Sequence, residues 1–80
     1  MIQLKEAIDK IKVLKPDHKV IGLSETEDIF IVLLDTDDEG YETVNKKTGE
    51  LGFLWFWEYG QLSIEGKIRD LDDALLEKAS

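Results

Sequence analysis

The sequence predicts an α+β fold with an N-terminal helix, a four-stranded antiparallel meander and a C-terminal helix, both helices lying on one face of the sheet. Apolar residues recur at three- and four-residue steps near both ends of the chain, which is typical of amphipathic helices. Between them lie short β-favouring segments joined by polar turns, and short connections favour antiparallel neighbours. Residues 1–80 are expected to form a single domain, because 80 residues suffice for only one core.

The two helices are expected at the ends of the chain. The first covers residues 2–14, where an apolar stripe runs from Leu4 to Leu14, and Pro16 follows where the helix should stop. The second begins at about Asp70, whose carboxylate can cap it.

Four strands are expected between the helices. Residues 19–23 and 28–34 form the first two, and the unbroken apolar run in the second predicts a central strand. The third covers residues 41–45. A hairpin loop follows, in which Gly49 takes a positive φ angle, and it leads to a fourth strand that contains the aromatic run.

The aromatic run, residues 53–59, is the most informative segment for function, because it holds five of the seven aromatic residues. Side chains alternate between the faces of a strand, which puts Leu54 and Phe56 on one face and makes both faces apolar. A sheet with two apolar faces completes a core, forms a homodimer or offers one face to another protein. The residues expected to share the partner-binding face are Phe53, Trp55, Trp57 and Tyr59.

The chain is acidic, with 18 acidic and 10 basic residues and a formal net charge of −8. This charge opposes direct binding to nucleic acid or to an anionic membrane. It either serves solubility alone or forms a surface that imitates nucleic acid and blocks a nuclease or another DNA-binding protein. The residues of that alternative acidic surface are Asp35, Asp37, Asp38, Glu39 and Glu42.

No catalytic, cofactor-binding or metal-binding residues are predicted. The chain has no cysteine, and its single histidine, His18, lies in an expected surface loop. Asp35, Asp37 and Glu39 have the opening spacing of a calcium loop, but Lys46 stands where a bidentate glutamate is required. With neither a cationic leader nor an apolar stretch of membrane-spanning length, the expected location is the cytoplasm.

The segment 19–54, with its apolar strand, acidic turn and lysine-threonine-glycine hairpin at 44–50, resembles small phage-borne and toxin-immunity proteins of bacteria. The hairpin is also similar to that of PepSY-type inhibitory domains, which are usually secreted or attached to membranes. The first resemblance implies an inhibitor, immunity protein or phage accessory factor. With the aromatic run, it predicts a non-enzymatic module that binds a protein of unknown identity.

Overall fold

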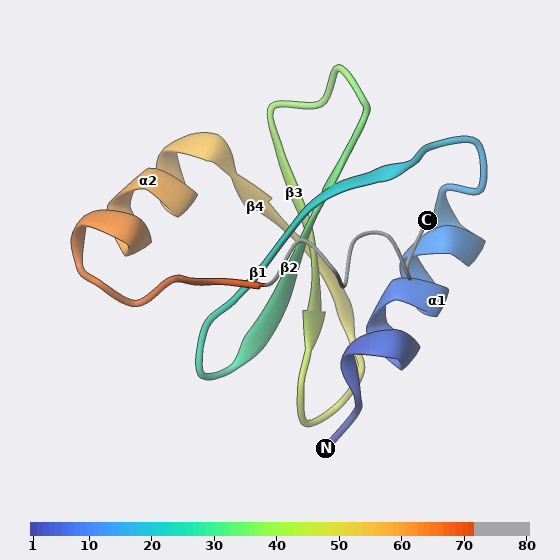
Figure 1. Ribbon diagram of the computed structural model, residues 1–80, viewed down its shortest axis with the longest axis horizontal. Helices are drawn as coiled ribbons and strands as arrows, with labels where there is room; N and C mark the ends of the chain where they lie inside the picture. Colours follow the sequence, from blue (N-terminus) through green and yellow to red (C-terminus); the bar gives the residue numbers. More distant parts are fainter. Residues whose placement is uncertain (72–80) are drawn as a thin grey trace.

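An N-terminal helix, a five-stranded sheet and a second helix make up the computed structural model, which describes residues 1–71 (Figure 1). The elements are α1 (Leu4–Leu14), β1 (Val20–Glu25), β2 (Ile29–Leu34), β3 (Gly40–Asn45), β4 (Leu51–Trp55), α2 (Phe56–Ile64) and β5 (Arg69–Asp70). The strands lie in the order β4-β3-β2-β1-β5, and all neighbours are antiparallel. The predicted α+β class is confirmed, and β1 to β4 follow one another as a meander.

Helix α1 forms where the sequence carries its first apolar stripe. Ala7, Ile8 and Ile11 are buried on this stripe. The backbone of Lys15 has already left helical geometry, since proline disfavours that geometry in the residue before it. The strand residues in the same hydrophobic core are Val20, Leu23, Phe30, Val32, Leu34 and Val44.

Strand β2 is the central strand, as its unbroken apolar run predicts. Ile31 and Val32 are both fully buried, although neighbouring residues of a strand point to opposite faces. Both faces of the sheet are therefore covered at β2.

The strand register assigns the side chains of β4 to the two faces. Val32, which packs in the α1 core, pairs with Glu42, and Glu42 pairs with Phe53. Paired residues share a face, so Phe53 lies on the face that α1 covers. Tyr41 and its partner Leu54 lie on the opposite face. There the ring of Tyr41 contacts aromatic rings of α2.

The two described helices lie on opposite sides of the sheet (Figure 1). Helix α2 was not among the predicted elements, and the predicted placement of the N-terminal and C-terminal helices on one face stays a prediction. The predicted C-terminal helix falls mostly on residues 72–80, which lie outside the described residues. Its expected first residue, Asp70, belongs to β5 and pairs with Ser24 of β1.

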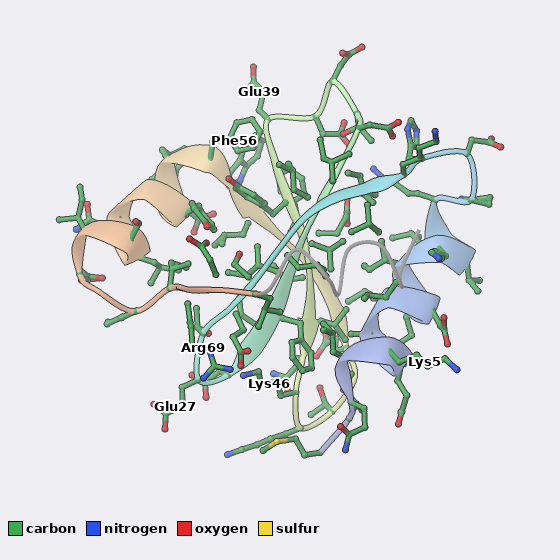
Figure 2. All side chains as sticks on the ribbon, in the orientation of Figure 1. Lys5, Glu27, Glu39, Lys46, Phe56 and Arg69 are labelled. Carbon is green, nitrogen blue, oxygen red and sulfur yellow. The ribbon has the colours of Figure 1, made fainter. Side chains whose placement is uncertain are left out.

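The prediction that the whole aromatic run forms a strand is also wrong, because β4 ends at Trp55 and α2 begins at Phe56. The last bond between the strands is donated by the Phe56 N–H to the Glu39 carbonyl, 2.9 Å away, and Figure 2 shows these two residues close together. The Glu58 carboxylate then accepts a hydrogen bond from the Trp55 N–H at 3.2 Å. Glutamate at this position is a common helix-start signal.

The hairpin between β3 and β4 forms as predicted. Gly49 has a φ of 74°, in the region that favours glycine, and its N–H donates to the Asn45 carbonyl at 2.8 Å. The side-chain oxygen of Asn45 accepts hydrogen bonds from the N–H groups of Lys47 and Thr48 at 2.8 and 3.0 Å. This tight turn sets the register of β4 against β3.

Candidate functional site

Within residues 1–71, the outer edge of β4 presents backbone groups that have no neighbouring strand. Hydrogen bonds join Asn45 to Glu50 at one end of the β3–β4 ladder and Phe56 to Glu39 at the other. Hydrogen-bonded pairs in an antiparallel ladder recur at every second residue. The backbone groups of Gly52 and Leu54 therefore point toward β3, whereas those of Leu51, Phe53 and Trp55 point outward.

The same three residues carry large exposed side chains, and we call Leu51, Phe53 and Trp55 the aromatic edge. Their exposed fractions are 39, 41 and 46%. The rings of Phe53 and Trp55 meet edge to face with centroids 5.1 Å apart, an arrangement that aromatic pairs favour. The aromatic edge is thus an ordered apolar row beside unpaired backbone groups.

A glycine on β3 makes room for this row. A Cβ atom on Gly40 would lie 2.6 Å from the ring of Phe53, closer than carbon atoms can approach. The Phe53 ring therefore rests directly on the backbone of β3. Packing against the β3 backbone fixes the position of the ring, while part of the ring stays exposed to solvent.

The remaining aromatic residues of the run lie on α2. Tyr59 stacks on Tyr41 with ring centroids 4.3 Å apart, and Phe56 meets Tyr41 edge to face at 5.2 Å. Burial raises the pKa of the Tyr41 phenol. Trp57 is 73% exposed. Of the four predicted partner-binding residues, the structure places Phe53 and Trp55 together on β4 and transfers Trp57 and Tyr59 to α2.

The predicted acidic surface is already partly neutralised within the chain. The Lys15 ammonium lies 2.7 Å from the Asp38 carboxylate and 3.2 Å from that of Glu42, whose side chain is almost buried. The hydrogen bond from Lys15 lowers the pKa of Asp38, and the pKa of Lys15 is raised by its bonds to both acids. Within residues 1–71, Asp35, Asp38 and Glu42 take part in side-chain ion pairs, whereas Asp37 and Glu39 take part in none.

Asp35, the first residue of that set, holds the loop that contains His18. Its carboxylate accepts a hydrogen bond from the Lys19 N–H at 2.8 Å and lies 3.2 Å from Nδ1 of His18. The Lys19 bond is the main cause that lowers the pKa of Asp35. Within residues 1–71, no three acidic, histidine or cysteine residues are grouped to hold a metal.

A second ionic cluster lies at the opposite end of the sheet. The Glu25 carboxylate contacts Nζ of Lys46 at 2.7 Å and a guanidinium nitrogen of Arg69 at 3.3 Å, and Figure 2 shows Lys46 and Arg69 converging there. Lys46 also lies over the ring of Phe30, 5.0 Å from its centroid. These contacts tie β5 and the β3–β4 hairpin to β1, so we read the cluster as structural.

Sequence reasoning missed two components of the aromatic edge, Leu51 and the glycine support under Phe53. It also missed the start of α2, for which two signals exist. Glu58 stands three residues after Trp55, and Phe56 and Tyr59 have the three-residue spacing of one helix face.

Comparison with models of protein families, with curated protein sequences and with solved structures finds no match to this chain. The resemblance to phage-borne and toxin-immunity proteins therefore stays a prediction. Within residues 1–71, no helix has both the length and the apolar character needed to cross a membrane.

Proposed function

We propose that this chain is a non-enzymatic protein-binding module, of the inhibitor, immunity or phage accessory kind, whose contact surface is the aromatic edge together with Trp57, which is exposed on α2. The observation that carries the proposal is the exposure of Phe53 and Trp55 on β4, the edge strand of the sheet formed by residues 1–71. Aromatic residues bury much area on binding at little cost in side-chain entropy. Unpaired strand edges also accept strands from other chains.

The ordered geometry of the edge supports this proposal over a role in the core. Phe53 and Trp55 are held by each other and by the β3 backbone, while Leu54 between them is buried on the opposite face. A partner would therefore meet a row that is already fixed, which lowers the entropy cost of binding.

The acidic-mimic alternative has less support. Imitation of a phosphate backbone requires several unpaired carboxylates on one continuous surface. Asp35, Asp38 and Glu42 are engaged with His18 or Lys15, and Glu42 is buried.

The test compares folding with association in the same variants. Trp55→Ala and Trp57→Ala are expected to lower the free energy of unfolding by less than about 1 kcal/mol, because both side chains are substantially exposed. Leu54→Ala, the buried neighbour, is expected to cost about 2–4 kcal/mol. Both tryptophan variants should weaken association with a captured partner or a second copy. Tryptophan variants that unfold as readily as Leu54→Ala, in a chain that is monomeric and binds no partner, would assign the aromatic edge to the core.

A further inference from the structure

We propose that the partner of the aromatic edge is a second copy of this chain, joined by antiparallel pairing of β4 with β4 about a two-fold axis at Gly52. This inference rests on the proposed function, since it names the occupant of the same surface. The part of the outer β4 edge that is free to pair is short. Among the described residues of this edge, Leu51 and Phe53 are the two that have both the outward N–H and the outward carbonyl available for a new strand.

At both ends of that edge, contacts within the chain prevent further strand pairing. At the C-terminal end, the Trp55 N–H is held by Glu58, and α2 begins at the next residue. At the N-terminal end, the next outward position is Gly49, whose N–H already donates a hydrogen bond to the Asn45 carbonyl. A longer foreign strand would place its additional backbone groups against α2 and the hairpin, where they would find no partners. The free edge of a second β4 ends at the same two positions, so the two edges have the same length.

The register of this pairing is self-complementary. With Gly52 facing Gly52 of the other copy, Leu51 of each copy faces Phe53 of the other, and each such pair exchanges two backbone hydrogen bonds. Every outward group of both residues is then satisfied. Gly52 would occupy the close, non-hydrogen-bonded position, where it has no side chain to obstruct the approach.

The side chains match in the same register. Leu51 and Phe53 point to the α1 face, so the two aromatic edges join into one continuous apolar row across the interface.

The net charge of −8 opposes this dimer. Two acidic chains repel each other over a distance that salt shortens. We therefore expect a weak dimer that becomes tighter as ionic strength rises, the opposite of the response expected for an acidic surface bound to a basic target.

Sedimentation equilibrium tests the dimer in the whole chain, from about 10 to about 500 µM and at about 0.05 and 0.5 M sodium chloride. The wild-type mass should rise toward that of a dimer with concentration, and more so at the higher salt. Phe53→Glu should raise the dissociation constant by at least about tenfold. Val13→Glu is the matched control, because it adds the same charge at an apolar residue of α1 that is 83% exposed, and it should dimerise almost as the wild type does.

Isotope-filtered NOE spectra of mixed ¹³C-labelled and unlabelled wild-type chains provide a test that needs no variant. Contacts between the methyl groups of Leu51 and the ring of Phe53 across the two copies are expected. A chain that stays monomeric over the whole range, or a dimer whose contacts lie elsewhere, would overturn the dimer proposal. A monomer that binds a foreign protein and loses it on Phe53→Glu would overturn the dimer alone and leave the protein-binding function standing.

Discussion

The ring of Tyr59 stacks on the ring of Tyr41 at a centroid distance of 4.3 Å and an interplanar angle of 23°. This contact joins α2 to β3 on the face opposite α1. Tyr59 and Trp57 therefore differ in role within the aromatic run. Trp57, two residues before Tyr59, is 73% exposed. Tyr59 packs the helix, whereas Trp57 is available to a partner.

The first prediction follows from this contrast. Tyr59→Ala should lower the free energy of unfolding by about 2 kcal/mol, since it removes a half-buried ring and its stacking contact. Trp57→Ala should change it by no more than about 0.5 kcal/mol. Urea unfolding followed by circular dichroism measures both. Equal losses for the two variants would contradict this division of roles.

The second prediction concerns the glycine under the aromatic edge. Gly40→Ala should destabilise the fold by about 1–3 kcal/mol, because the added methyl group collides with the Phe53 ring and the Leu54 carbonyl. Gly60→Ala is the control, since a Cβ atom there would meet nothing within 4 Å. If thermal unfolding shows the two variants to be equally stable, the Phe53 ring does not rest on β3.

The third prediction concerns stability in acid. The pKa values of Asp35 and Asp38 are lowered in the folded chain, chiefly by hydrogen bonds from the Lys19 backbone and from Lys15. Their contribution to stability is therefore complete above the ordinary carboxyl pKa of about 4 and is lost as the pH falls through the lowered values. Asp35→Asn and Asp38→Asn should each reduce stability at pH 7 and flatten its decline in acid.

Asp37→Asn serves as the control for that measurement, because Asp37 is exposed and lies outside these ion pairs. Unfolding curves recorded from about pH 7 to about pH 2 should overlay those of the wild type for this variant. A slope of stability against pH that is the same in all three variants would show that the Asp35 and Asp38 contacts contribute nothing.

The fourth prediction is that the acidic turn binds no stoichiometric calcium. Asp35 is engaged with Lys19 and His18, and Asp38 with Lys15. Lys46, at the twelfth position of the loop, forms an ion pair with Glu25 instead of supplying a ligand. Titration calorimetry should show no saturable heat at micromolar calcium. A micromolar site that disappears in Asp35→Ala would reverse this conclusion.

Much of the sheet follows from local pattern. The stripe of α1, the apolar run of β2 and the Asn45–Gly49 turn each have strong preferences within a few residues, and the structure agrees with all three. Each of these segments also points to the same tertiary arrangement, so local and global preferences do not conflict there.

The end of β4 could not be read from strand propensity, because aromatic residues favour strands. A tertiary contact overrides that preference. Continued alternation would put Tyr59 on the face of Phe53, whereas the turn into a helix after Trp55 lets Tyr59 stack on Tyr41 on the opposite face. The separation of the helices onto two faces follows from the same turn. Which aromatic residues remain exposed depends on this packing and therefore cannot be obtained from alternation along a strand.

We propose that the aromatic edge, and not the acidic surface, binds the partner. The most direct test of this proposal is the dissociation constant of the dimer, or of a captured partner, at about 0.5 M salt, where the Debye length is roughly 4 Å. We expect wild-type binding to persist there. It should be weakened by about tenfold or more in Trp55→Ala or Trp57→Ala, and it should change little in the double variant Asp37→Asn, Asp38→Asn. The opposite result would favour the acidic surface: wild-type binding would be lost at this salt concentration, and neither tryptophan substitution would change the dissociation constant.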